Sequence, residues 1–153
     1  MTHSTATKYS YEATVVDEIL DNVELITEHR NSVEKAERGE FSPDREAFNE
    51  LQKYGMLSSF VVRCDGKIVG YCMVQVSKSL HQADTERGIV DNIYVMKQHR
   101  GYCGSKLIAF VSEQLLSFGV TDLYHLVPTH RSWGAVLKRQ GFSHIEDVYH
   151  KGL

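Results

Sequence analysis

The sequence has few of the residues that mark several protein classes. Only 2 prolines and 3 cysteines occur among its 153 residues, and no stretch approaches the roughly 18 consecutive apolar residues of a membrane span. These shortages argue against a collagen-like or low-complexity chain, a disulfide framework and a transmembrane helix. The C-x-x-C, H-E-x-x-H and H-x-x-x-H patterns are absent, and the first 15 residues contain no apolar signal-peptide core. We therefore expect a reduced, cytoplasmic protein without a metal.

Negative charge predominates in the first part of the chain and positive charge in the last. Residues 1–95 carry 10 Lys and Arg against 16 Asp and Glu, whereas residues 96–153 carry 7 against 4. A basic second part suits an anionic ligand, although ordinary variation of surface charge produces the same counts. Residues 12–50 hold 12 acidic against 4 basic side chains, which fits a cationic partner or a solvated helix face and argues against duplex DNA.

The spacing of apolar residues predicts four helices. Positions three and four residues apart recur in these segments, and a glycine lies close to each expected end. For the second helix, Ser42 is the expected N-cap and Pro43 the first-turn residue. The expected helices cover Val15 to about Glu37, Ser42 to about Tyr54, Ser105–Phe118 and Arg131–Gln140.

Short runs of β-branched and aromatic residues predict the strands. Ser59–Cys64 and Lys67–Val76 flank Asp65-Gly66, which is a strong hairpin signal. A hairpin followed by alternating strands and helices predicts an α/β protein whose mixed sheet has helices on both faces. The other expected strands are Tyr9–Thr14, Ile89–Met96, Leu123–Val127 and His144–His150.

The segment Ile93–Ile108 (IYVMKQHRGYCGSKLI) carries the strongest chemical signal, because it reads as a strand, a basic glycine-containing turn and a helix. Gly101 and Gly104 allow a phosphate to approach the main chain at the helix N-terminus, and the lysines and arginine around them add positive charge. The spacing fits neither a P-loop nor a dinucleotide-binding fingerprint. A glycine-containing turn between a strand and a helix also occurs for structural reasons alone.

This segment resembles the acetyl-coenzyme A motif of the GNAT N-acetyltransferase superfamily, in which Q/R-x-x-G-x-G/A follows a strand. Gln98-His99-Arg100-Gly101-Tyr102-Cys103 fits the pattern with a cysteine in place of the small last residue, and a shorter register uses Arg100-Gly101 and Gly104. Downstream, HRSWGAVLKRQGF ends in Gly141-Phe142 and resembles the last helix of the family. The ending THRSWGAVLKRQGF followed by V-Y-x-K further resembles a subgroup found in tailed-phage genomes.

The resemblance implies the GNAT fold over nearly the whole chain. This is an α/β fold with a central mixed, mostly antiparallel twisted sheet of six to seven strands and about four helices on both faces. One domain is expected over residues 1–153. It would comprise an N-terminal arm or first strand at 1–14, two substrate-side helices at 15–55, a core sheet at 56–127 and a C-terminal helix and strand at 128–153.

The resemblance also implies acetyl-CoA as co-substrate, bound where the strands 89–96 and 123–127 splay apart. The backbone of the first of these strands would pair with the pantetheine arm, and the 98–105 loop would hold the pyrophosphate. The predicted cofactor-binding residues are Ile93, Tyr94, Val95, Met96, Gln98, Arg100, Gly101, Tyr102, Cys103, Gly104, Ser105, Lys106 and Ser132.

Acetyl transfer to an amine calls for residues that move protons. Asp91 resembles in position the acidic base of many family members, although a strand cap or a loop contact accounts for it equally well. The family's general-acid tyrosine falls on Leu137, which cannot donate a proton. Tyr124 and His130 are the predicted substitutes, with Ser132 as a further option; departure of the CoA thiolate without an assigned acid is left open.

The predicted function is direct transfer of an acetyl group from acetyl-CoA to a primary amine of a small molecule or a protein. A GNAT-fold protein that has lost catalysis, acting as a binding or phage virion-associated component, is one alternative. Modification of a nucleic-acid base or tRNA is a second, which the acidic first part disfavours. We expect no membrane or nucleic-acid partner and a cytoplasmic location, the host's cytoplasm for a phage protein. A homodimer and the identity of the acceptor stay open.

Overall fold

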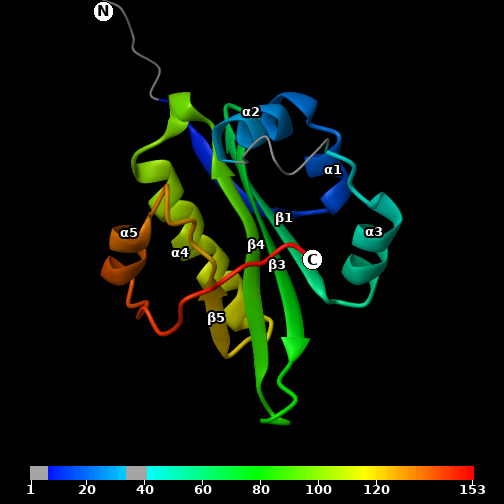
Figure 1. The fold of residues 1–153 in the computed structure, drawn as a ribbon. Helices are drawn as coiled ribbons and strands as arrows, with labels where there is room; N and C mark the ends of the chain where they lie inside the picture. Colours follow the sequence, from blue (N-terminus) through cyan, green and yellow to red (C-terminus); the bar gives the residue numbers. More distant parts are fainter. Residues whose placement is uncertain (1–6, 34–40) are drawn as a thin grey trace, which may run out of the picture.

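A computed structural model describes residues 7–33 and 41–153 and shows five strands in the order β1-β2-β3-β4-β5. The first four strands pair antiparallel, and β5 pairs parallel with β4. The sheet is therefore mixed and mostly antiparallel, as the sequence predicted (Figure 1). The strands are β1 (Tyr9–Thr14), β2 (Leu57–Cys64), β3 (Lys67–Lys78), β4 (Glu86–Val95) and β5 (Asp122–His125).

Helices cover both faces of this sheet, with α1, α2 and α3 on one face and α4 and α5 on the other (Figure 1). The apolar residues of α4 follow the expected spacing, and five of them are buried against the sheet. The helices are α1 (Val16–Leu20), α2 (Val23–Val33), α3 (Arg45–Lys53), α4 (Tyr102–Ser117) and α5 (Gly134–Arg139), with a 3₁₀ turn at Lys97–His99.

The β2–β3 hairpin forms where the sequence predicted it. Asp65 has φ 49° and Gly66 has φ 85°, and a two-residue turn with positive φ at both positions matches the right-handed twist of the flanking strands. Phe60, Val61 and Val62 of β2 are fully buried. The hairpin therefore forms the centre of the hydrophobic core.

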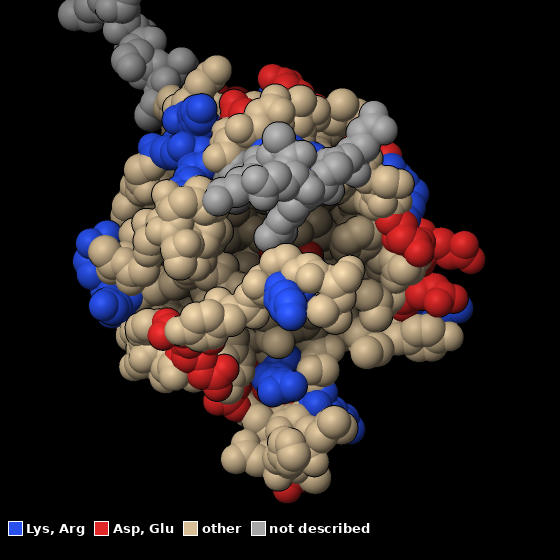
Figure 2. Space-filling view, in the orientation of Figure 1, with Lys and Arg blue, Asp and Glu red and all other residues tan. Residues whose placement is uncertain are grey.

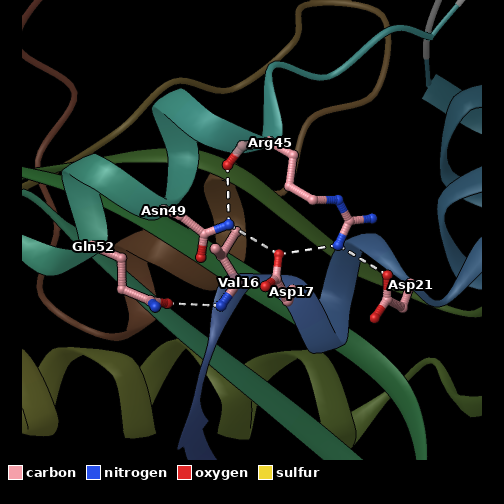
Figure 3. Close-up of polar contacts among 6 residues, drawn as sticks. All are labelled: Val16, Asp17, Asp21, Arg45, Asn49 and Gln52. Atoms are coloured by element: carbon pink, nitrogen blue, oxygen red, sulfur yellow. Dashed lines mark hydrogen bonds and ion pairs between the residues drawn. The ribbon is translucent and has the colours of Figure 1, made fainter.

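Polar contacts attach α3 to α1, because α3 has no buried residue of its own. Arg45 and Asn49 both donate to the Asp17 carboxylate at 3.0 Å (Figure 3). The backbone N–H of Val16 donates to Gln52 Oε1 at 2.7 Å. These hydrogen bonds add to the apolar contacts of Phe48 and Leu51, which are partly buried against the core.

The prediction of one helix from Val15 to Glu37 is wrong, because the helix breaks after Leu20. Asn22 Oδ1 accepts a hydrogen bond from the backbone N–H of Leu25 at 3.2 Å, so Asn22 starts a second helix. The expected end near Gly39 lies outside the described residues. Likewise Asp44, and not Ser42, caps α3, since its side chain accepts from the Ala47 N–H.

The expected C-terminal strand at His144–His150 is also wrong, since residues 143–153 are extended chain without strand pairing. Ile145 and Val148 are three residues apart and so cannot share one face of a strand. His144 Nε2 contacts Asp147 Oδ1, three residues further along the chain, at 3.1 Å. The described part of the chain thus has five strands, fewer than the six to seven predicted.

Candidate functional site

The strands β4 and β5 separate part of the way along the sheet. Their parallel pairing runs from Arg87 opposite Asp122 to Val90 opposite His125. Beyond this point β4 continues to Val95, whereas β5 ends at His125. Backbone groups of β4 after Val90 are therefore left without a strand partner on that side within the described chain. The resemblance to the GNAT family implied that these two strands splay apart, and their pairing ends at this point.

A β-bulge lies where the two strands part. Met73 of β3 pairs with Asn92 and Val74 pairs with Val90, so Asp91 is an extra residue in β4. Bulges bend and twist a strand and are frequent beside active sites. The bulge therefore places Asp91, the predicted base, directly after the last residue of β4 that pairs with β5.

The Asp91 side chain is held by its neighbours. Gln75 Nε2 donates to Oδ1 at 3.3 Å and Asn92 Nδ2 donates to Oδ2 at 2.8 Å. Gln75 is paired with Ile89, which is paired with Tyr124, and residues directly opposite each other share a face of a sheet. The Asp91 carboxylate and the Tyr124 side chain thus lie on the same face, which is the face of α1 and α2.

The turn before α4 exposes backbone donors. Gly101 has φ 111° and ψ −120°, and no side chain caps the first turn of α4. The first N–H groups of a helix have no intrahelical partner, and the helix dipole favours an anion there. The glycine-containing turn therefore has the arrangement of an anion-binding helix N-terminus, with the exposed Lys106 ammonium beside it.

A groove runs along α4 from this turn towards α5. Gln140, at the end of α5, donates to the Ser105 backbone oxygen at 2.8 Å and contacts Ser105 Oγ at 3.0 Å, which fixes the two helices together. The Lys106 ammonium lies 4.8 Å from the centre of the Tyr102 ring. The residues that line the groove are Tyr102, Ser105, Lys106, Ala109, Ser112 and Gln140.

Several predicted cofactor residues face elsewhere. Cys103 is buried, so only its backbone faces the turn. Arg100 bends back, donating from Nε to the Val95 oxygen at 3.2 Å and from Nη2 to the Tyr94 hydroxyl at 3.2 Å. Ser132 Oγ accepts from the Gly134 N–H at 3.1 Å.

The remaining predicted positions lie around the cleft. The His130 side chain is exposed in the connection between β5 and α5. Gln98 belongs to the 3₁₀ turn, and Ile93 and Met96 belong to the end of β4 or follow it directly. The structure thus brings the backbone of the turn close to the end of β4. The side chains that were predicted to bind the cofactor or to act in catalysis do not all lie there.

A buried cluster under α2 was missed by the sequence reading. His29 stacks on the Tyr94 ring with centroids 4.6 Å apart and contacts the Tyr71 hydroxyl through Nδ1. Burial lowers the pKa of His29 to about 4, and the Arg131 and Arg30 charges act in the same direction. The only signal in the sequence was a histidine in line with Leu25 and Ile26 on a helix face.

His125, the last residue of β5, was also missed. Its ring packs edge-on against Phe142 at 5.0 Å, and both ring nitrogens are buried without a hydrogen-bond partner. Burial lowers the pKa of His125 to about 4, so the imidazole is neutral at pH 7. His125 lies where β4 and β5 part because of the register between these strands, and the sequence pattern does not predict that register.

Charge is divided between the two sides of the molecule. In the view of Figure 2, Lys and Arg gather over α5 and near the start of α4 and Asp and Glu gather over α3, with a further acidic patch at the lower left and basic side chains near the centre. Among the described residues no group of His, Cys, Asp and Glu could hold a metal ion. None of the helices within those residues is long and apolar enough to cross a membrane.

This arrangement of a bulged β4, a splayed β5 and a glycine turn before α4 defines an acetyltransferase-type α/β fold. The family model described as Acetyltransferase (GNAT) family matches residues 23–142. The chain therefore belongs to the GNAT acetyltransferase family, and the family and fold class predicted from the sequence are confirmed. The comparisons do not support the more specific likeness to a subgroup of tailed-phage genomes.

Solved structures of several acetyltransferases have the same fold over 95% of this chain. An aminoglycoside acetyltransferase from an uncultured soil metagenomic sample has a TM-score of 0.74, 18% identity and 95% of its own chain covered. Glucosamine-6-phosphate N-acetyltransferase from Arabidopsis thaliana has a TM-score of 0.72, 17% identity and 95% coverage.

Ribosomal-protein-alanine N-acetyltransferase from Brucella melitensis biovar Abortus has a TM-score of 0.69, 18% identity and 99% coverage, against 95% of this chain. No curated protein matches the sequence. At these identities the likeness shows the fold alone, and the three proteins are named for chemically different amines.

Proposed function

We propose that this acetyltransferase moves an acetyl group from acetyl-CoA directly to a primary amine, without a covalent enzyme intermediate. The observation that carries the proposal is the succession along β4 and α4 of a bulged aspartate, β4 backbone without a β5 partner among the described residues, and a helix N-terminus without a side-chain cap. These three features supply a proton acceptor, a surface for an amide-containing chain and a phosphate site.

The cleft fits the parts of acetyl-CoA. The pantetheine arm carries amides that can pair with the backbone of β4 on the side away from β3, where Ile93 has no strand partner among the described residues. The pyrophosphate is a dianion suited to the amides between Gln98 and Ser105, with Lys106 as counter-charge. A Cβ at Gly101 would meet no heavy atom within 4 Å, so the turn leaves open space where a phosphate would approach.

Asp91 is the proposed proton acceptor. The amine nitrogen attacks the thioester carbonyl carbon, and its proton passes to the Asp91 carboxylate directly or through water. The tetrahedral intermediate then collapses, the C–S bond breaks, and the CoA thiolate takes up a proton. Gln75 and Asn92 hold the carboxylate in place and orient it along the cleft.

Tyr124 is the favoured proton donor among the predicted residues. It shares the sheet face of Asp91, whereas His130 lies in the connection beyond the strand. Leu137 takes the position of the family's tyrosine and is 6% exposed, so it belongs to the core. This buried leucine favours the second candidate, a GNAT-fold protein that binds acetyl-CoA but does not turn it over.

Titration calorimetry with acetyl-CoA tests the cofactor part of the proposal, and thiol release on a panel of amines tests catalysis. We expect micromolar binding and amine-dependent release of CoA. Asp91→Asn should keep the binding and lower kcat about 100-fold or more, with a greater loss at low pH, where less free amine is present.

Asp84→Asn is the matched control, because Asp84 is an exposed carboxylate in the turn before β4. Binding without any amine-dependent release would establish the non-catalytic alternative. No binding at millimolar acetyl-CoA would refute both.

A further inference from the structure

Two arginines converge on one aromatic ring beside the cleft. The guanidinium carbons of Arg100 and Arg131 lie 5.3 and 5.7 Å from the centre of the Tyr94 ring. Arg100 belongs to the turn before α4, and Arg131 belongs to the connection between β5 and α5. Side chains from the two walls of the splayed cleft therefore meet over a single residue of β4.

The Arg131 guanidinium has unused hydrogen-bonding capacity. Its contact with Tyr94 is a cation–π interaction, and within the described chain it has no hydrogen bond and no ion pair. An arginine carries five N–H donors in a planar fork that matches a carboxylate or a phosphate. Arg131 is half-buried, and its N–H donors are available to bind an anion.

Within the described residues, the groups that contact Tyr94 carry more positive than negative charge. Glu28 is the carboxylate of the cluster, and it already accepts from the Tyr94 hydroxyl at 2.9 Å and from the Lys97 N–H at 3.2 Å. Arg131 lies over the Tyr94 ring, on which His29 of α2 also stacks, so its charge is close to α2. Among the described residues this one carboxylate contacts Tyr94 together with two guanidinium groups, and it can balance the charge of only one of them.

The face of the sheet on which the Arg131 side chain lies indicates whether an anion bound there belongs to the cofactor or to the acceptor. Tyr94 points towards α2, where it meets His29 and Ser32. The next residue, Val95, points to the other face, where its Cγ2 lies 3.9 Å from the Cβ position of Gly104 in α4. The backbone around Gly104 thus lies on the α4 side, whereas the side chain of Arg131, like that of Arg100, reaches to the α2 side, on which Asp91 also lies.

We infer that Arg131 binds an anionic group of the acceptor, so that the acceptor is an amine that also carries a carboxylate or a phosphate. This inference rests on the proposed function. Asp91 and Tyr94 are three residues apart on β4, roughly 10 Å along the strand. The acceptor's amine and anion are therefore separated by several bonds, as in an amino sugar phosphate or in lysine acylated at its side chain.

Matched probe pairs test the inference on the full chain. Glucosamine-6-phosphate is compared with glucosamine, and lysine with cadaverine, since each pair differs by one anionic group. We expect kcat/KM for the anionic member of at least one pair to exceed that of its partner about tenfold or more. The phosphate pair and the carboxylate pair distinguish the two kinds of anion.

Arg131→Gln should abolish this preference through KM and leave the affinity for acetyl-CoA unchanged. Arg131→Lys should restore it only in part, because lysine lacks the planar fork. Arg139→Gln, on the exposed side of α5, removes the same charge elsewhere and should keep the preference.

Equal rates within both pairs, or a preference that survives Arg131→Gln, would overturn the inference. So would an Arg131→Gln enzyme whose only defect is weaker acetyl-CoA binding, since the arginine would then serve the cofactor. If no probe reacts, calorimetry of the same pairs on CoA-loaded protein decides, and failure of both anionic members to bind refutes it. Acetyl-CoA binding, measured separately, reports on the proposed function.

Discussion

Gly101 begins α4 with φ 111° and ψ −120°, the mirror image of an ordinary strand conformation. Residues with a Cβ rarely adopt these angles, and only glycine does so without strain. The cost of this conformation for another residue is about 1–3 kcal/mol. The turn therefore depends on glycine because of its backbone angles, and space for a phosphate is a second consequence of the same residue.

Gly101→Ala should therefore lower the free energy of unfolding by about 1–3 kcal/mol and weaken acetyl-CoA binding. Gly104→Ala is the control for stability, because its Cβ would lie 3.9 Å from Val95 Cγ2 and the residue is helical. That variant should be neutral or more stable by up to about 1 kcal/mol. Denaturant unfolding of both variants measures the difference, and equal losses would contradict the argument.

His125 makes stability depend on pH. Its pKa is lowered by burial to about 4 in the folded chain, against 6.5 when unfolded, so the unfolded state binds more protons between these values. The stabilisation is present above pH 6.5 and is lost as pH falls towards 4. Between pH 8 and pH 5 this residue should cost about 2 kcal/mol of stability.

His125→Phe should remove that share of the pH dependence. It should also be tolerated at pH 7, because the two ring nitrogens have no partner to lose. Urea unfolding at pH 8 and pH 5 measures the change. A variant whose stability falls with acid as steeply as that of the natural chain would show that His125 is not the group responsible.

The cap of α3 shows how an element boundary depends on one side chain. Asp44 Oδ1 accepts from the Ala47 N–H at 3.0 Å, and the same helix holds Asp17 of α1 through Arg45 and Asn49. Asp44→Ala should lower stability by about 1 kcal/mol. Ser42→Ala, at the position that the sequence favoured, should change it little. Thermal unfolding of the pair decides, and a larger loss for Ser42→Ala would reverse the assignment.

The sequence predicted elements well where the signal is local. The Asp65-Gly66 turn, the apolar periodicity of α4 and a glycine turn before it are all properties of neighbouring residues and are present, although α4 begins at Tyr102 and not at Ser105, so that Gly104 is helical. The break at Asn22 and the missing C-terminal strand depend on interactions that compete with the predicted helix or strand. A side-chain cap displaces a helix, and a strand needs a partner, so neither outcome is contained in the segment itself.

The candidate site was predictable in part for the same reason. Backbone donors in a glycine turn follow from local sequence, and so does the position of Asp91 on a strand. The bulge at Asp91, the unpartnered His125 and the contact of Arg131 with Tyr94 depend on register between strands far apart in the chain. Hydrophobic patterns determine which face of a strand is buried, but not where one strand gains a residue over its neighbour.

For the whole molecule, the C-terminal segment adds little to stability. Residues 143–153 are exposed throughout and cross in front of β4 and β3 (Figure 1). Ile145, Val148 and Tyr149 are 64%, 74% and 92% exposed. Removing residues 144–153 should therefore change the free energy of unfolding by less than about 1 kcal/mol.

A truncation that also removes Phe142 is the control, because this ring packs on His125 and is partly buried. It should lower stability by more than 1 kcal/mol, on the order of the cost of losing a packed aromatic ring. Guanidinium unfolding of both truncated chains measures this. A large loss on removing residues 144–153 alone would mean that the segment is packed in solution.

The extra residue at Asp91 determines to which face of the sheet each later side chain of β4 points. Gly88 faces α4 before it and Val95 faces α4 after it, although one number is even and the other odd. Deleting one residue there would turn Tyr94 into the apolar layer under α4 and Val95 towards α2. The β4 side chains on the proposed acceptor side and on the proposed cofactor side would then be exchanged. The one extra residue, Asp91, therefore determines which side chains of β4 face each substrate.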